Sequence, residues 1–184
     1  MLVRAEAGAL VNTSSINGFW GTVGPYTPHT SYAASKFAVK GFTEALIADF
    51  RVNAPHLSAH VVMPGHIGTS IALNSNAMHG GTDVQSVRKQ MAEMGHDVDQ
   101  FSDEQIEQMV RDRGEAFRDH ATTSAAQAAT IILDEVLAGE WRILVGDDAH
   151  LIDDLVREDP WSAYEPEFMQ RIIDRGHLGA FDRG

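Results

Sequence analysis

The feature that most restricts the fold is a pair of short apolar segments separated by one helical segment. GALVNT (8–13) is rich in strand formers, and SAHVVMPG (58–65) is a second apolar run, which Pro-Gly ends. The apolar side chains between them recur at intervals of three and four, as in a helix: Phe37, Ala38, Phe42, Ala45, Leu46 and Phe50. A strand, a helix and a strand in this order predict two parallel strands joined by a crossover.

The helix has predictable limits. A loop rich in Gly, Pro and Thr precedes it, and Thr30 or Ser31 is expected to cap its first turn. Its end is expected near Asn53, because Pro55 follows.

A second crossover follows later in the chain. Ser124 and Gln127 have the spacing of a capping box before AATIILDEVLAG, and Gly139 suits a helix end. The segment WRILVG, 141–146, is a third apolar strand. The whole pattern predicts one α/β layer fold over residues 1–184.

Two regions lie outside these crossovers. Residues 66–122 are polar and less regular, with one expected helix after the capping box of Ser102 and Gln105, and we interpret them as a lid-like insertion. Residues 147–184 are expected to form a tail of two short amphipathic helices separated by Pro160.

Composition narrows the class of protein. Cysteine is absent, which excludes disulfides and thiolate zinc sites, and no apolar run approaches the roughly 18 residues of a membrane span, so a soluble cytoplasmic protein is expected. Residues 1–82 hold four Lys/Arg and three Asp/Glu, whereas residues 83–184 hold ten and twenty-three. The acidic second half repels phosphate backbones and anionic lipid, so small molecules are the expected partners, not nucleic acid or membranes.

Tyr32 and Lys36 stand four residues apart in SYAASKFAVKGF, near the start of the predicted helix. Residues at this spacing share one helix face, and a cation fixed beside a phenol favours the phenolate, which suits proton transfer. The pair alone is also compatible with a packed tyrosine and a solvated lysine. Its neighbours favour the first interpretation, because the strand ends before and after this helix lie where open α/β sheets bind ligands.

Taken together, VNTSSINGF, YAASK and VVMPGHIGT resemble, in this order, the single-domain branch of the short-chain dehydrogenase/reductase family. The resemblance implies a three-layer Rossmann-like parallel sheet and a hydride-transfer enzyme that interconverts an alcohol and a ketone or aldehyde with NAD or NADP. It assigns catalysis to Ser15, which would bind the substrate oxygen, to Tyr32, which would transfer the proton, and to Lys36. Ser14 is the less favoured serine.

The same resemblance implies a cofactor site. Tyr32 and Lys36 would meet the nicotinamide ribose. The segment along the nicotinamide would comprise Pro64, Gly65, Ile67 and Thr69, with the Ile67 backbone and the Thr69 hydroxyl on the carboxamide.

The family's glycine-rich TGxxxGxG turn does not occur in this sequence. We therefore expect the chain to be the C-terminal part of a longer enzyme, with an incomplete sheet reduced to the family's strands 5-6-7, and to be inactive or impaired alone. The alternative is a non-catalytic remnant that acts as a protein-interaction module through its exposed sheet edge and helix.

Substrate and assembly are expected from apolar residues. Phe19 and Trp20, with Met78, Met91 and Met94 of the insertion, would line a pocket for a bulky apolar alcohol or ketone, or else pack the core. Family members commonly pair through the Tyr/Lys helix, so the full-length protein is expected to be a homo-oligomer.

Metal and hydrolase sites are not expected. The nine histidines, among them His56 and His60, lack ligand spacing and are expected at the surface. The acidic pairs 147–148 and 153–154 are expected to be solvated. The segment TSSIN lacks both glycines of a nucleophile elbow.

Overall fold

The computed structural model describes residues 6–22, 29–78, 80–93 and 95–177. The chain divides into two compact units. The first unit comprises residues 1–67 and 122–184, and the second comprises residues 68–121.

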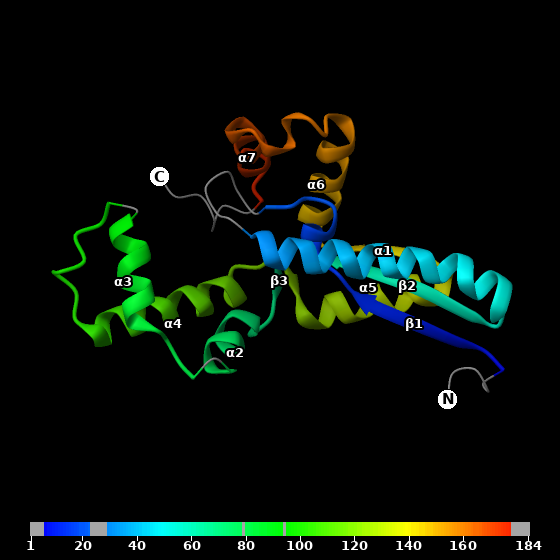
Figure 1. The fold of residues 1–184 in the computed structure, drawn as a ribbon, viewed down its shortest axis with the longest axis horizontal. Coiled ribbons are helices and arrows are strands. Elements are labelled where there is room, and N and C mark those ends of the chain that lie inside the picture. Colours follow the sequence, from blue (N-terminus) through cyan, green and yellow to red (C-terminus); the bar gives the residue numbers. More distant parts are fainter. Residues whose placement is uncertain (1–5, 23–28, 79, 94, 178–184) are drawn as a thin grey trace. The chain divides into compact units, whose positions relative to one another are not determined.

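Three parallel strands form the sheet of the first unit. They are β1 (Gly8–Thr13), β2 (Leu57–Pro64) and β5 (Arg142–Val145), in the order β1-β2-β5 (Figure 1). In the register, Thr13 is opposite Val62 and Pro64 is opposite Val145. The central strand β2 is buried on both faces, as its apolar run predicts. The predicted strands, their parallel pairing and their order are confirmed.

The crossover helix α1 (Thr30–Asn53) lies against the sheet and ends where the sequence predicts. The Asn12 amide on β1 donates to the hydroxyl of Thr43 on α1 at 3.0 Å, so the helix covers the face toward which Asn12 points. The predicted cap is wrong, because the N-cap residue is His29, without a side-chain hydrogen bond. Thr30 and Ser31 already lie inside the helix.

The opposite face of the sheet is covered by α5 (Ala125–Ala138), so the first unit has three layers. Val62, Ile143 and Val145 pack with Ala128 of this helix. Its predicted capping box is confirmed, and Gly139 ends it at φ 85°, in the left-handed region that glycine favours. A two-stranded pairing of β3 (Ile67–Gly68) with β4 (Thr123–Ser124) precedes α5.

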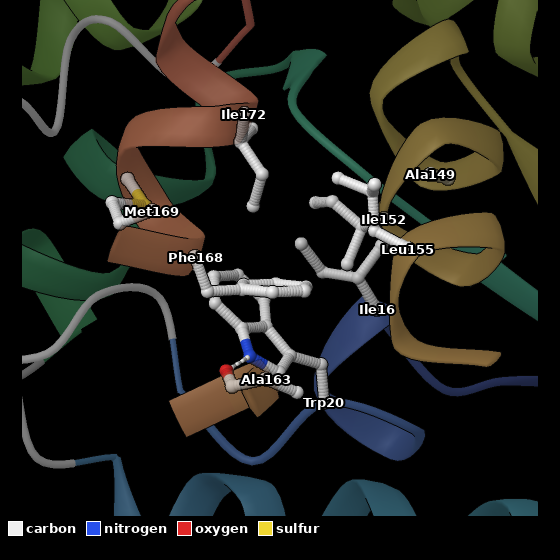
Figure 2. Packing of buried hydrophobic residues seen from close by; sticks show 9 residues of the cluster. All are labelled: Ile16, Trp20, Ala149, Ile152, Leu155, Ala163, Phe168, Met169 and Ile172. Carbon is white, nitrogen blue, oxygen red and sulfur yellow. Dashed lines mark hydrogen bonds between the residues drawn. The ribbon is translucent and has the colours of Figure 1, made fainter. Parts of the chain in front are cut away.

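A second cluster holds the C-terminal helices to the sheet. The elements are α6 (Asp147–Glu158), the short 3-10 helices η2 (Ile16–Gly18) and η3 (Ser162–Tyr164), and α7 (Pro166–Ile173). Figure 2 shows their buried side chains, with the rings of Trp20 and Phe168 5.5 Å apart and the Trp20 indole N–H donating to the Ala163 carbonyl at 2.7 Å. The two predicted tail helices are confirmed.

The second unit consists of helices in its described residues, which exclude 79 and 94. They are α2 (Ile71–Met78), α3 (Val84–Glu93) and α4 (Asp103–Asp119). The capping box of α4 is present, as predicted. The expectation of a single helix here is wrong, because α2 and α3 also form. Arg88 on α3 donates to the carbonyl oxygens of Val98 and Phe101 and bridges to Asp103, which ties α3 to the start of α4.

Two expectations of solvent exposure are corrected in the first unit. Asp153 is 7% exposed and accepts hydrogen bonds from the guanidinium groups of Arg142 and Arg157. Burial alone would raise the pKa of Asp153, but the two arginines outweigh burial and hold this pKa below its ordinary value. His60 is 1% exposed, between the Ser58 hydroxyl and the Glu140 carbonyl, each at 2.7 Å. Both side chains are therefore structural.

Among the described residues, none of the helices combines the length and the apolar character that crossing a bilayer requires.

Candidate active site

Ser15 lies at the carboxyl end of β1, where the sheet pairing stops. The Ser14 N–H still donates to the Val62 carbonyl at 2.7 Å, and Ser15 then begins η2 as its N-cap residue. Its hydroxyl oxygen accepts from the Asn17 N–H at 3.2 Å. Because that contact uses a lone pair of the oxygen, the hydroxyl hydrogen stays available for donation to another oxygen atom.

Ser14 has a different environment. Its hydroxyl donates to the backbone carbonyl of Lys36 at 2.8 Å, and the side chain is 2% exposed. A Cβ at Gly18 would lie 2.3 Å from the Ser14 oxygen and 3.1 Å from the Lys36 carbonyl oxygen. The glycine thus allows α1 to pack closely against η2. The hydrogen bond from Ser14 to the Lys36 carbonyl links α1 to the segment that precedes η2.

Tyr32 and Lys36 come together on the first turns of α1. The ammonium nitrogen of Lys36 lies 5.5 Å from the centroid of the Tyr32 ring and donates to the Thr13 carbonyl, at the end of β1, at 3.1 Å. Tyr32 is 43% exposed. Within the described residues, its hydroxyl and the other two N–H donors of Lys36 have no hydrogen-bond partner. These groups could therefore hold the hydroxyls of a ligand.

The segment after β2 starts beside the end of β5. Pro64 ends β2, and the Gly65 N–H donates to the Val145 carbonyl at 2.9 Å. Ile67 is 9% exposed and packs with Val62 and Val145. Thr69, the last predicted cofactor residue, belongs to the second unit and is partly exposed.

The residues expected to line a substrate pocket differ in their burial. Trp20 is 1% exposed and belongs to the core of Figure 2, so the expectation that it lines a pocket is corrected in favour of packing. Phe19 is partly buried, with the guanidinium of Arg142 5.5 Å from its ring centroid. Met78 is 87% exposed, Met91 is partly exposed, and the side chain of Met94 lies outside the described residues.

Three residues near these groups escaped sequence analysis. The Asn17 amide, 3% exposed, donates to the carbonyl oxygens of Trp20 and Thr22 and so fixes the turn after Ser15. The His29 ring stands edge-on to the Tyr32 ring, with 6.0 Å between centroids. Asp148, in an acidic pair expected in solvent, is 2% exposed and accepts from the His66 N–H at 2.6 Å. Of these three, only Asn17 has a local signal, since it lies in the segment SSING that follows the expected strand.

Comparison with known proteins identifies relatives. Residues 1–80 match the family model described as short chain dehydrogenase. SadH of Mycobacterium tuberculosis, a protein named as an oxidoreductase, is 31% identical over 156 residues, which is 85% of this chain and 46% of SadH. The 3-ketodihydrosphingosine reductase of Bacteroides thetaiotaomicron is 40% identical over 73 residues, which is 40% of this chain and 25% of the reductase.

A solved structure matches the fold. The short chain dehydrogenase/reductase of Burkholderia phymatum, determined in complex with NAD, has a TM-score of 0.59 and 24% identity. The match covers 90% of this chain and 52% of that one. The chain therefore has a partial Rossmann-like fold and spans about half the length of SadH and of this structure.

Proposed function

We propose that this chain belongs to the short-chain dehydrogenase/reductase family, whose model matches residues 1–80, and that its protein is an NAD(P)-dependent oxidoreductase that interconverts an alcohol and a ketone or aldehyde. Ser15, Tyr32 and Lys36 are the proposed catalytic residues. The observation that carries the proposal is the cluster at the end of β1, where Lys36 bridges from the Tyr32 ring to the Thr13 carbonyl and Ser15 follows two residues later.

The residues present fit the nicotinamide half of such a cofactor. Lys36 has two N–H donors without a partner in the described residues, which suits the two hydroxyls of a ribose. On the proposal, Tyr32 shares this contact, and the segment of Pro64, Gly65 and Ile67 holds the nicotinamide. When bound, the cofactor supplies or accepts the hydride.

The chain's own residues handle the oxygen of the substrate. In the direction of reduction, the Ser15 hydroxyl donates a hydrogen bond to the carbonyl oxygen and polarises it. The Tyr32 hydroxyl gives its proton to the same oxygen as the alcohol forms, and the Lys36 ammonium stabilises the phenolate that results. In oxidation the proton returns to Tyr32. Asn17 supports the serine, because its N–H fixes the Ser15 oxygen.

The proposed substrate is a small molecule, namely a bulky alcohol or ketone of apolar character. Phe19 is the residue that we propose for contact with it, since its ring remains partly exposed just after Ser15 and η2. One relative is named as a reductase of 3-ketodihydrosphingosine, which is a keto compound. Assembly as a homo-oligomer and a cytoplasmic location remain part of the proposal.

The experiment is a turnover assay on the protein expressed from its full open reading frame. Absorbance at the nicotinamide band follows NADH and NADPH separately, with a long-chain ketone and a sugar phosphate as competing substrates. Consumption of one dinucleotide with the ketone supports the proposal. A folded protein that oxidises neither NADH nor NADPH in the presence of the ketone contradicts the proposal. The same assay on residues 1–184 tests the proposal that this part alone is inactive or impaired.

A second candidate function is a protein-interaction module without catalysis. It is favoured by exposed apolar side chains on α1, where Phe42 is 59% and Val52 is 78% exposed, and by Val11 on β1, which is 40% exposed. A protein that folds and binds neither dinucleotide would favour this candidate.

A further inference from the structure

The Asp148 carboxylate occupies the space beside the backbone of residues 65 and 66. It lies in the first turn of α6 and is 2% exposed. One carboxylate oxygen accepts from the His66 N–H at 2.6 Å, and the other is buried without a hydrogen-bond partner. Burying a carboxylate costs free energy unless hydrogen bonds or ion pairs compensate for the lost hydration. Here one oxygen has such a hydrogen bond and the other does not.

Two glycines make room for this carboxylate. A Cβ on Gly65 would lie 2.2 Å from one Asp148 oxygen, and a Cβ on Gly146 would lie 2.5 Å from the same oxygen. Gly146 has φ 101°, so its conformation also favours glycine, whereas Gly65 has no such conformation. At Gly65 it is therefore the space that Asp148 fills, and not the backbone conformation, that excludes a larger side chain.

We propose that Asp148 is a positioning residue for the nicotinamide-binding segment, an inference that rests on the proposed function. The segment is fixed at two successive amides: Gly65 donates to the Val145 carbonyl, and His66 donates to Asp148. The buried Ile67 side chain anchors the next residue. Asp148 thus sets the path of the backbone just before the groups proposed to meet the carboxamide, and it does so from the helix that follows β5.

A hydrogen bond to a charged group is among the stronger contacts in proteins, so its loss should be measurable. Asp148→Ala removes the acceptor of this hydrogen bond. Asp148→Asn has nearly the same shape and keeps an oxygen that can accept from His66. The inference predicts that Asp148→Asn keeps the hydrogen bond to His66 and the dinucleotide affinity that Asp148→Ala loses. The NH2 group of the asparagine must fit where the second carboxylate oxygen lies.

Gly65 offers an independent test that does not depend on removing a charge. Gly65→Ala places a methyl group into the carboxylate and should displace the segment. Combined with Asp148→Ala, the same methyl group meets no carboxylate. The double variant should therefore bind dinucleotide no more weakly than Asp148→Ala alone. The losses of affinity in the two single variants would then be strongly non-additive.

The experiment combines two readouts on the full-length protein and these variants. Hydrogen exchange of the His66 amide, measured by NMR without cofactor, reports the contact itself. The dissociation constant for NAD(H) or NADP(H), measured by titration calorimetry, reports the consequence. We expect Asp148→Ala to lose protection at His66 and to bind dinucleotide about tenfold more weakly, with Asp148→Asn close to wild type. Near-UV circular dichroism restricts the comparison to folded variants.

The two ways of failing are distinct. Wild-type protein that folds but binds neither dinucleotide would overturn the proposed function, and the role of Asp148 with it. Wild-type protein that binds, together with a folded Asp148→Ala variant that binds equally well or keeps His66 protected, would overturn the inference about Asp148 alone. Additive losses in the Gly65→Ala and Asp148→Ala cycle would also contradict it.

Discussion

The ammonium nitrogen of Lys36 lies 5.5 Å from the centroid of the Tyr32 ring. Its hydrogen bond to the Thr13 carbonyl, at 3.1 Å, holds the partly exposed cation at the end of β1. The fold thus places a cation, a phenol and the Ser15 hydroxyl near the carboxyl end of one strand.

Lys36→Met removes the cation and keeps most of the side chain's volume. We expect weaker dinucleotide binding together with a loss of turnover of about 100-fold, because both the ribose contact and the stabilisation of the phenolate are lost. Steady-state kinetics and calorimetry measure the two effects. Lys40→Met is the matched control, since Lys40 pairs with Glu44 at 2.8 Å on the same helix. Equal losses in both variants would count against a specific role for Lys36.

Ser15→Ala removes the proposed donor to the substrate oxygen, and we expect kcat to fall about 100-fold. Ser14→Ala is the comparison, because it removes the hydrogen bond to the Lys36 carbonyl and should lower the free energy of unfolding by about 1 kcal/mol. Its kcat should fall less than that of Ser15→Ala. The reverse order of kcat values would identify Ser14 as the functional serine.

Asp153→Asn is expected to destabilise the first unit in a pH-dependent way. The arginines lower the pKa of the folded-state Asp153, so its stabilising effect is complete above the ordinary value of about 4 and is lost as pH falls through the folded value. Urea unfolding should show a loss of about 3 kcal/mol at pH 7 and a smaller one at pH 3.

The control for Asp153 is Glu158→Gln, which breaks an exposed bridge to Arg171 at 3.0 Å. We expect a change of no more than about 0.5 kcal/mol at either pH. A loss in Asp153→Asn that does not change between pH 7 and pH 3 would show that its charge is not what stabilises the fold.

Trp20→Ala tests the reassignment of Trp20 from the substrate pocket to the core. It should cost about 4 kcal/mol of unfolding free energy, because it leaves a cavity in the cluster of Figure 2 and removes the donor to the Ala163 carbonyl. Trp20→Phe should cost less. Trp161→Ala, at a side chain that is 90% exposed, should change stability by less than about 0.5 kcal/mol. If Trp20→Phe left the free energy of unfolding unchanged and raised the substrate KM, the result would instead support a contact between Trp20 and the substrate.

Local signals predicted most of the framework. Both capping boxes and the left-handed Gly139 form as expected, because these motifs depend on residues within one turn. The N-cap of α1 was predicted wrongly. Thr30 and Ser31 both favour the N-cap position, but the helix already begins at Thr30 and its N-cap residue is His29. Helices α2 and α3 are only 8 and 10 residues long, too short for their apolar spacing to stand out in a polar region.

Burial of ionisable side chains was the part that sequence did not predict. Asp148 meets the amide of His66, 82 residues away in the chain, and His60 meets the carbonyl of Glu140, 80 residues away. An acidic pair beside a strand is usually solvated, and only the folded sheet reveals which member turns inward. The candidate catalytic residues were accessible to sequence analysis because Tyr32 and Lys36 are one helical turn apart, whereas Asp148 contacts the segment after β2 from a distant part of the chain.

The most direct measurement of the central claim compares wild type with Tyr32→Phe, both expressed from the full open reading frame. This change removes only the phenolic oxygen that we propose as the proton donor. With a reducible ketone, wild type should oxidise NADH or NADPH, and Tyr32→Phe should lose all but about one part in 1,000 of kcat while its dinucleotide dissociation constant stays close to that of wild type. A folded Tyr32→Phe variant that retains wild-type turnover would contradict the account.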